Sequence, residues 1–226
     1  KVGGTPPPLL YDLTALQKEA NRRNGFSADK TLSIAQSLYE KKITTYPRTG
    51  SRYISEDVFE EIPTLLRKIG ETLPTPLNRH SVDNAKVTDH HAIIPTGETP
   101  SGLLADEATI YNMVVTRFVE AFSPDSEEER MQVELTDGTN TFTWKACRPI
   151  SLGWKSVQNE TKEGKSEDEE QDLAMLPDLK EGEEPLLLSS EITEHKTKPK
   201  PLYTEATLLS AMENAGKEVE EADKRK

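Results

Sequence analysis

Residues 27–53 read SADKTLSIAQSLYEKKITTYPRTGSRY, and this stretch contains the change from helix to loop on which the fold prediction depends. Ser27 is a favourable helix N-cap. Apolar side chains then recur at helical spacing, at Leu32, Ala35, Leu38 and Tyr39. Pro47 disfavours helical geometry at the residue before it, so the phenol of Tyr46 is expected on a loop. The stretch therefore predicts a helix that ends shortly before a tyrosine loop.

Further helices are expected on both sides of this stretch. Upstream, Thr14 and Gln17 match a capping box, and Gly25 supplies a stop for the helix that follows. Downstream, helices are expected from Ser55, over residues 64–69 with an end at Gly70, over residues 104–122, and from Thr204.

After Pro124 the apolar pattern changes to alternation. Two alternating runs flank Asp137-Gly138, which is a strong signal for a β-hairpin. Further strands are expected around Trp154 and over residues 185–196. Because helices come first, antiparallel strands next and one helix last, the sequence predicts an α+β fold with a mainly helical domain and a small antiparallel β part.

Three buried residues are expected in that β part. Trp144 and Trp154 are expected in the sheet core, with base stacking as the alternative role. Cys147 is expected to be a small buried residue.

The predicted domain division follows from these patterns. It consists of a connector at 1–6, a helical domain at 7–124, an antiparallel β segment at 125–200 and the truncated start of a further helical domain at 201–226. Within the β segment, residues 159–184 hold eleven acidic and three basic residues. Because so polar a stretch buries too little apolar area to offset its ordering entropy, an acidic flexible loop is expected there.

The charge of the chain is strongly uneven. The whole sequence has 28 Lys and Arg against 40 Asp and Glu, a net charge of −12, which argues against a nucleic-acid partner. Residues 1–55, however, carry nine basic and four acidic residues and could face a polyanion. The single cysteine excludes an intrachain disulfide and a zinc site built on cysteine pairs, and it fits a reducing, cytoplasmic location. No apolar run is long enough for a membrane span.

The first candidate for chemistry is Tyr46 with Arg48. The guanidinium of Arg48 could favour the phenolate, and it could hold a phosphate and stabilise developing charge. Thr49 and Ser51 add hydroxyl donors for phosphate oxygens. This combination suits attack of a tyrosine on a phosphodiester. The alternative is an ordinary half-buried loop tyrosine beside a surface arginine.

The second candidate is His90, in the segment DHHAIIPT at residues 89–96. A histidine there could bind a phosphate or donate a proton. Two adjacent histidines do not form a metal site, because their side chains diverge and further ligands are not evident nearby. The alternative is a loop in which Ile93 and Ile94 fill the core and the histidines are merely polar.

Four segments together resemble the type IA DNA topoisomerases, and most closely their topoisomerase III branch. They are PPPLLYDLTALQKEANRRNGFSADKTLSIAQSLYE at 6–40, ITTYPRTGSRY at 43–53, HHAIIPT at 90–96 and TKPKPLYTEATLLSAMENAGK at 197–217. The resemblance implies an ATP-independent enzyme in which Tyr46 cleaves one DNA strand, forms a 5′-phosphotyrosyl link, allows strand passage and reseals. Arg48 would stabilise the scissile phosphate. The expected DNA-binding residues are His90, Gln36, Thr45, Thr49 and Arg52. The helical part would carry the nucleophile, and the β part would belong to the topoisomerase arch.

The sequence departs from the family pattern in two respects. The family usually has Asp at the position of Gly50. A Toprim domain, with a Glu and an Asp-x-Asp motif that bind Mg²⁺, would precede Lys1, and the helical domain would continue beyond the last segment. We therefore expect an internal fragment of a larger enzyme, without a metal site of its own. Its expected partners are single-stranded DNA and the Toprim domain, with no membrane, and the fragment alone is expected to be inactive.

Two other interpretations remain open. A non-catalytic module that binds single-stranded nucleic acid, or a scaffold, would use the basic N-terminal part and stack Tyr46 on a base. Reverse gyrase shares the type IA module, but it would need a helicase-like region elsewhere in the parent chain.

Overall fold

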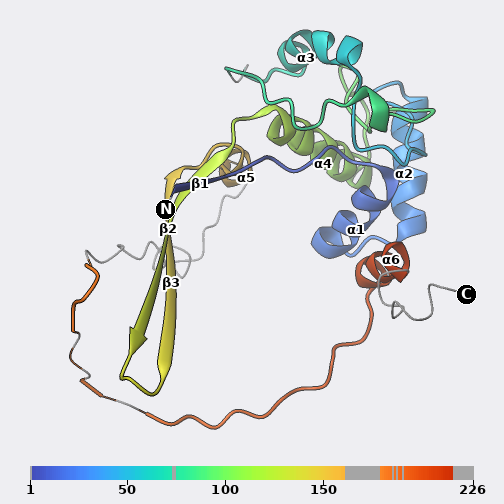
Figure 1. The fold of residues 1–226 in the computed structure, drawn as a ribbon. Coiled ribbons are helices and arrows are strands. Elements are labelled where there is room, and N and C mark those ends of the chain that lie inside the picture. Colours follow the sequence, from blue (N-terminus) through green and yellow to red (C-terminus); the bar gives the residue numbers. More distant parts are fainter. Residues whose placement is uncertain are drawn as a thin grey trace, which may run out of the picture.

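The structure is a computed structural model that describes residues 2–72, 75–160, 179–184, 186, 188–189 and 191–215. It confirms the predicted α+β class, with helices and one three-stranded antiparallel sheet. In chain order, the elements are β1 (Val2–Thr5), α1 (Leu13–Asn24), α2 (Ala28–Glu40), α3 (Glu56–Lys68), the 3₁₀ turn η1 (Asn84–Lys86), α4 (Ala105–Phe122), β2 (Ser126–Thr136), β3 (Thr141–Ser151), α5 (Lys155–Glu160) and α6 (Glu205–Glu213). Figure 1 shows that the β2–β3 hairpin projects away from a helical body.

Most helix ends follow the predicted capping signals. The Ser27 hydroxyl accepts the N–H of Lys30 at 3.1 Å, and Thr204 caps α6 in the same way. Gly25 ends α1 with a φ of 67°, a conformation that glycine adopts without steric cost. The start of α1 differs from the prediction. Its N-cap is Asp12, not Thr14, and the Asp12 carboxylate accepts the N–H of Ala15 at 2.6 Å.

Helix α3 continues through Pro63, where the sequence predicts two separate helices. Proline costs about 3 kcal/mol in a helix interior, because it removes a hydrogen bond and crowds the preceding turn. Ile62, just before this proline, and Leu65 and Leu66, just after it, are buried. Burial of each such side chain contributes about 1.5–3 kcal/mol, so tertiary packing outweighs the proline and keeps one helix.

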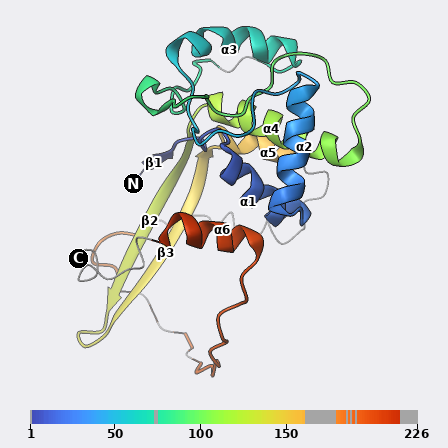
Figure 2. The same ribbon diagram turned by 90° about the vertical axis from the view of Figure 1, so that its right-hand side faces the viewer.

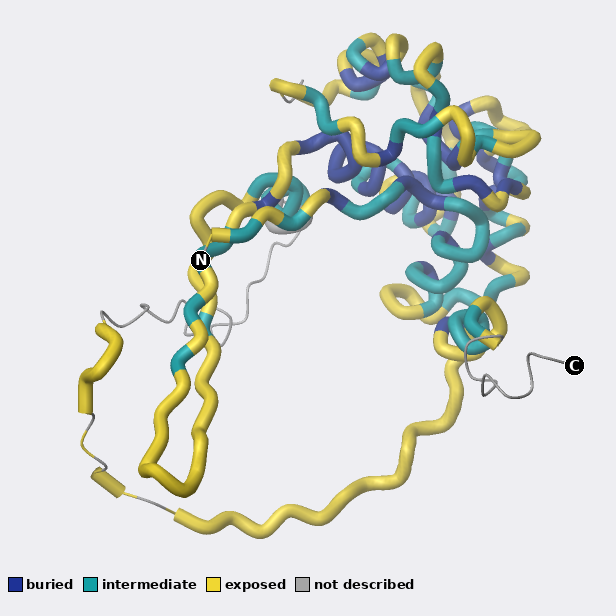
Figure 3. Tube along the Cα trace, in the orientation of Figure 1, coloured by how far each residue is buried: buried dark blue, intermediate teal, exposed yellow. Residues whose placement is uncertain are grey.

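Helix α4 is the centre of the helical body and contributes to two apolar clusters. Phe118 and Phe122 pack with α3, whereas Ile110 and Val114 pack with α1 and α2. Figure 3 shows that buried residues are concentrated in this body, while the hairpin is largely exposed. The part of the molecule that is rigidly packed is therefore the part that carries the Tyr46 loop. None of the helices in the described ranges combines the length and apolar character needed to cross a lipid bilayer.

The sheet confirms the predicted hairpin but differs from the prediction at its edge. β2 and β3 pair antiparallel around Asp137-Gly138, with Val133 opposite Trp144. Residues 2–5, expected as a connector, form β1 and pair with the start of β2. The VGGT sequence gives little local signal for a strand, so this pairing depends on a long-range contact.

Several predictions for the β part are wrong. Trp144 is 42% exposed and Cys147 is exposed, because the described residues provide no second layer to cover the hairpin. Trp154 lies in a turn before α5, where its indole N–H donates to the carbonyl of Thr5 at 3.1 Å. The described residues of 185–196 form no strand. The predicted acidic loop at 159–184 falls largely on residues 161–178, which lie outside the described residues.

The junction between the helical body and the hairpin is tightly packed. The backbone N–H of Trp154 donates to the carbonyl of Pro124 at 2.9 Å. Gly153 has a φ of 49°, and a Cβ atom there would lie 2.2 Å from the carbonyl oxygen of Asp125. Glycine is therefore required where the end of β3 crosses the start of β2.

Helix α6 packs on α1, as Figure 2 shows from the side. The backbone N–H of Ala206 donates to Asn21 Oδ1 at 3.1 Å, and Glu205 accepts the N–H of Ala28 at 2.6 Å. Lys18 pairs with Glu213 at 2.7 Å. The sequence predicts that residues 201–226 begin a further domain. In the structure, residues 201–215 are in contact with the helical body. The domain division itself stays a prediction.

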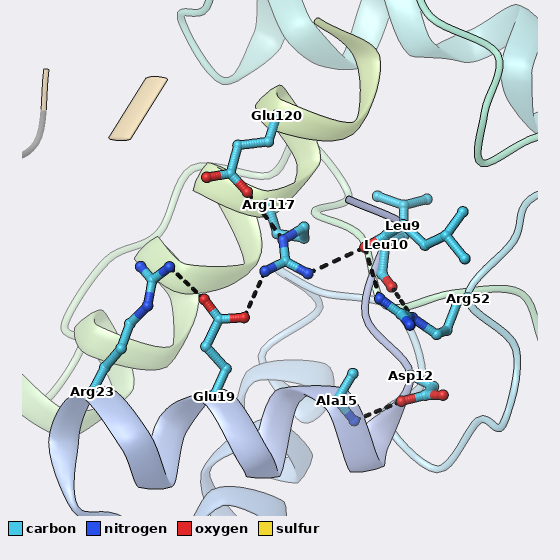
Figure 4. Close-up of polar contacts among 9 residues, drawn as sticks. All are labelled: Leu9, Leu10, Asp12, Ala15, Glu19, Arg23, Arg52, Arg117 and Glu120. Atoms are coloured by element: carbon cyan, nitrogen blue, oxygen red, sulfur yellow. Dashed lines mark hydrogen bonds and ion pairs between the residues drawn. The ribbon is translucent and has the colours of Figure 1, made fainter. Parts of the chain in front are cut away.

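A charged network ties α4 to α1 and to the chain before α1 (Figure 4). Arg117 donates to Glu120 at 3.0 Å and to the carbonyl of Leu9 at 3.2 Å, and it pairs with Glu19. Its guanidinium also lies 4.3 Å from the ring centroid of Tyr11. Desolvation alone would lower the pKa of Arg117, but Tyr11 and the two carboxylates raise it above its usual value.

A second charged cluster joins the end of α2 to the start of α4. Glu107 accepts from the Ser37 hydroxyl at 2.6 Å and from the N–H of Leu104 at 2.9 Å, and its carboxylate pairs with Lys41. Hydrogen bonds from Lys41, Ser37 and Leu104, in that order, lower the pKa of Glu107 to about 2. This cluster fixes the helix end that leads into the Tyr46 loop.

Candidate active site around Tyr46

The two loops that the sequence singles out lie side by side. The N–H of Thr45 donates to the carbonyl of Ile94 at 2.9 Å, and the N–H of Thr96 donates to the carbonyl of Ile43 at 3.2 Å. Thr44 and Pro95 form an isolated antiparallel bridge. The chain before Tyr46 is therefore held along its length by the segment that follows His90.

Tyr46 stands on this loop with its ring between two other aromatic rings from different elements. The ring centroids of Tyr46 and His90 are 4.6 Å apart, and those of Tyr46 and Tyr39 are 5.3 Å apart in an edge-to-face arrangement. Tyr46 is half-buried. Within the described ranges, its hydroxyl has no hydrogen-bond partner, so it is available to a ligand.

The segment 90–96 has buried isoleucines, as the alternative interpretation of its sequence expects, and an exposed histidine whose proposed phosphate-binding role stays a prediction. Ile93 and Ile94 are 2% and 3% exposed, and they belong to different apolar clusters because consecutive side chains of an extended chain point to opposite sides. His90 is exposed and contacts Tyr46. His91 turns to its own backbone instead, with Nδ1 2.7 Å from the carbonyl oxygen of Ala92.

Arg48 is exposed, and in the described part of the chain its guanidinium forms no hydrogen bond or ion pair. The structure gives no contact between Arg48 and the Tyr46 ring. An unpaired guanidinium on the same loop remains free to bind an anion.

The other predicted DNA-binding residues use their polar groups within the protein. Thr45 Oγ1 donates to the carbonyl of Ala92 at 3.2 Å and accepts the N–H of Ile94 at 3.0 Å. Arg52 donates to the carbonyl of Leu10 at 3.1 Å, close to where Arg117 binds (Figure 4). The Gln36 amide donates to Glu40 at 3.1 Å.

Thr49 and Ser51 are buried beneath the loop. Thr49 Oγ1 donates to the carbonyl of His90 at 2.9 Å and accepts the N–H of Ser51 at 3.1 Å. Ser51 donates to the carbonyl of Lys86 at 2.8 Å. These hydroxyls therefore position the backbone of the Tyr46 and His90 loops. Gly50, between them, has open space where a Cβ would lie, so an aspartate fits there.

Sequence reasoning missed two residues beside Tyr46. Tyr39 counts among the apolar residues at helical spacing, yet it is 40% exposed and contacts Tyr46. Lys42 has a φ of 63°, unusual for a residue with a Cβ. Both line a groove of about 490 Å³ that also includes Tyr46. The one available signal was that α2 ends without the usual glycine.

Within the described ranges, no group of three or more His, Cys, Asp or Glu side chains could hold a metal ion. The residues that the structure describes therefore do not fit a Mg²⁺ site, and we assign no metal ligand.

Comparisons with known proteins identify the family of the chain. A family model described as DNA topoisomerase matches residues 1–216. DNA topoisomerase 3 of Shouchella clausii is 38% identical over 239 residues, which cover 99% of this chain and 32% of that protein. DNA topoisomerase 3 of Bacillus licheniformis is 41% identical over 224 residues, which cover 92% of this chain and 30% of that protein.

The structural comparison points to the same family. The structure of full-length topoisomerase I from Thermotoga maritima has a TM-score of 0.65 and 27% sequence identity, and the match covers 96% of this chain and 36% of that one. This chain thus spans about a third of the length of the curated relatives it matches. From the family match, the relatives and the shared fold together, the chain belongs to the DNA topoisomerase family, as a type IA, topoisomerase III-like member.

Proposed function

We propose that this chain carries the nucleophile of an ATP-independent topoisomerase reaction, in which Tyr46 cleaves one DNA strand, a second strand passes, and the break is resealed. The observation that carries the proposal is the Tyr46 phenol itself. It stands on a fixed loop, contacts the His90 ring and has a hydroxyl without a partner among the described residues. A nucleophile must be held in position and yet be accessible, and this phenol meets both requirements.

The proposed step exchanges one phosphodiester for another. The Tyr46 oxygen forms a bond to phosphorus while the bond from phosphorus to the 3′ oxygen breaks. The phenol loses its proton, and the 3′ oxygen takes one up. The product is a 5′-phosphotyrosyl ester with a free 3′-hydroxyl, and the reverse step reseals the strand without external energy.

The neighbours of Tyr46 take different roles in this proposal. Arg48 and His90 are exposed, and we assign them to the scissile phosphate, where positive charge stabilises the transition state. Gln36 and Thr45 lie near the proposed path of the single strand. Thr49 and Arg52 support the site from beneath, because their polar groups bind backbone carbonyls.

The whole reaction needs parts that we place outside the described residues. A Toprim domain of the same parent protein would supply the Mg²⁺ site and complete the groove for single-stranded DNA. Residues 1–226 alone would then give little or no cleavage. A cytoplasmic location is part of this proposal, since the substrate is DNA.

The proposal is tested by trapping the covalent product. The full-length protein is mixed with end-labelled single-stranded DNA and denatured with SDS, and the labelled peptide is identified by mass spectrometry. We expect the adduct on Tyr46, and we expect Tyr46→Phe to abolish it while DNA binding is retained. An adduct that persists in Tyr46→Phe would refute the assignment. Salt-reversible binding without any adduct would favour the non-catalytic alternative.

A further inference from the structure

A groove beside Tyr46 is lined in part by residues to which no role has been assigned, Lys42 and Tyr39 among them. It has a volume of about 490 Å³, within the range of sites for small organic ligands. Its walls come from the end of α2, the Tyr46 loop and Thr96. The lining residues are Tyr39, Glu40, Lys42, Thr44, Thr45, Tyr46 and Thr96. His90 is not among them, so the groove lies beside the phenol and apart from the His90 contact.

Lys42 is held in this groove at a conformational cost. It follows the C-cap of α2 in a Schellman motif, in which the Lys42 N–H donates to the carbonyl of Tyr39 at 2.8 Å and the Ile43 N–H donates to the carbonyl of Leu38 at 3.1 Å. This motif needs a left-handed residue, and its usual occupant is glycine. A lysine is strained there, at a φ of 63°. Thr96 stabilises the strained residue, because its hydroxyl donates to the Lys42 carbonyl at 2.6 Å.

The side chain of Lys42 has no structural role that would explain this strain. Lys42 is exposed, and its ammonium has no hydrogen-bond or ion-pair partner in the ranges that the structure describes. Residues in sparsely populated backbone conformations cluster at functional sites, so this one is a candidate for a functional role. An unpaired ammonium at the rim of a groove is suited to a phosphate.

The wall formed by Tyr39 suits a different part of the same ligand. Its ring meets Tyr46 edge to face and is still 40% exposed, so part of its surface is free. An exposed tyrosine ring is a stacking surface for a nucleobase. The carboxylate of Glu40 lies in the same groove and can accept hydrogen bonds from the amino group of a base.

We propose that this groove is a nucleotide subsite, which takes the first nucleotide of the strand whose 5′-phosphate becomes linked to Tyr46. The base lies against Tyr39, and the next backbone phosphate lies on the ammonium of Lys42. This inference rests on the proposed function, because it places the subsite next to the phosphate that Tyr46 attacks. The subsite holds the covalently bound end of the broken strand.

The test uses the strain at Lys42, because glycine there removes the ammonium and relieves the backbone. Binding of a fluorescein-labelled single-stranded oligonucleotide to the full-length Tyr46→Phe protein is measured by anisotropy over a series of salt concentrations. We expect added Lys42→Gly to raise Kd about tenfold, to reduce the salt slope by about 0.7 and to raise Tm by about 2 °C. Lys42→Arg keeps Kd close to that of the parent. Lys145→Gln, on the projecting β3 strand, is the control for loss of one positive charge.

If Lys42→Gly binds the oligonucleotide more weakly while its Tm rises, Lys42 acts in binding and not in stabilising the fold. If Lys42→Gly and Lys42→Asn both left Kd and the salt slope unchanged, the subsite would be excluded. With Tyr46 restored, Lys42→Gly should raise KM for cleavage and leave kcat within about twofold, since only binding is weakened. A fall in kcat with unchanged KM would also exclude the subsite.

The stacking surface is tested separately. Tyr39→Ala should raise Kd about tenfold, and Tyr39→Phe should restore it, because the ring and not the hydroxyl forms the surface. Equal affinities for the two variants would contradict the proposed stacking. Failure of the proposed function has a different signature, namely an adduct that does not depend on Tyr46. An adduct that requires Tyr46 but a Kd indifferent to Lys42 and Tyr39 would overturn the subsite alone.

Discussion

The rings of Tyr46 and His90, which come from two separate loops, lie with their centroids 4.6 Å apart and their planes inclined by 49°. Backbone hydrogen bonds between the loops maintain this contact, and Thr49 adds one from its hydroxyl to the His90 carbonyl. The main chain therefore places the His90 imidazole beside the Tyr46 phenol. The His90 side chain can then be removed without disturbing the loop.

His90→Ala should slow formation of the covalent adduct by about 10²-fold, the typical effect of removing one positioned donor from a developing charge. Stability should change by less than about 0.5 kcal/mol, because His90 is exposed. Single-turnover cleavage of labelled DNA measures the rate. His91→Ala is the matched control, since the His91 ring faces the Ala92 carbonyl. An equal loss in both variants would argue against a special role for His90.

Arg117→Ala should destabilise the protein by about 3–5 kcal/mol, because it leaves buried Glu120 without the arginine that pairs with it. The carbonyl of Leu9 also loses a donor. Urea unfolding followed by circular dichroism measures the effect. The double variant Arg117→Met with Glu120→Gln should recover part of the stability, since the buried carboxylate is removed together with the arginine that pairs with it. A decrease of less than about 1 kcal/mol in the free energy of unfolding of Arg117→Ala would show that the charged network contributes little to stability.

Glu107 should make stability depend on acid pH. Its folded pKa of about 2 lies below the ordinary value of 4.5, so the folded state favours the carboxylate. The resulting stabilisation is fully present above pH 4.5 and is lost as the pH falls towards 2. Glu107→Gln should therefore lower Tm at neutral pH, and the difference from the parent should shrink across that window.

Thermal melts at a series of pH values test this expectation. Glu61→Gln, at an exposed position on α3, serves as the control for the loss of one carboxylate. A constant difference between Glu107→Gln and the parent down to pH 2 would mean that the Lys41–Glu107 pair is not the source.

Gly153→Ala should cost about 3 kcal/mol, because the new Cβ would lie 2.2 Å from the Asp125 carbonyl oxygen at a left-handed φ of 49°. Gly50→Ala is the matched control. It has nothing within 4 Å of the new Cβ, and its effect should stay within about 0.5 kcal/mol. Gly50→Asp should be tolerated equally. Chemical denaturation of the three variants measures these costs, and similar values for Gly153→Ala and Gly50→Ala would contradict the steric argument.

Local signals in the sequence predict much of the fold because they act over a few residues. Gly25, Ser27 and Thr204 mark helix ends, and Asp137-Gly138 marks the hairpin. The failures share a long-range cause. Burial of the residues around Pro63 keeps α3 continuous, and β1 exists through its pairing with β2. Neither contact can be read from a short window of sequence.

The site shows the same division. The residue types of Tyr46, Arg48 and His90 suggest the chemistry that we propose for them, and the resemblance to a family groups them into one site. The contact between Tyr46 and His90 depends on pairing between distant loops, which the sequence alone does not give. Lys42 was missed because a left-handed conformation is unusual for lysine, so residue type argues against the conformation that it adopts.

The tight junction at Gly153 has a mechanical consequence. Trp154 donates there to the carbonyls of both Thr5 and Pro124, and β2 is paired on both edges from its first residues. The base of the projecting hairpin is therefore held against the end of α4, and we expect a force on the hairpin tip to act on α4 as well. A movement of the hairpin base is accordingly expected to carry β1 and the end of α4 with it, because pairing and hydrogen bonds join the three.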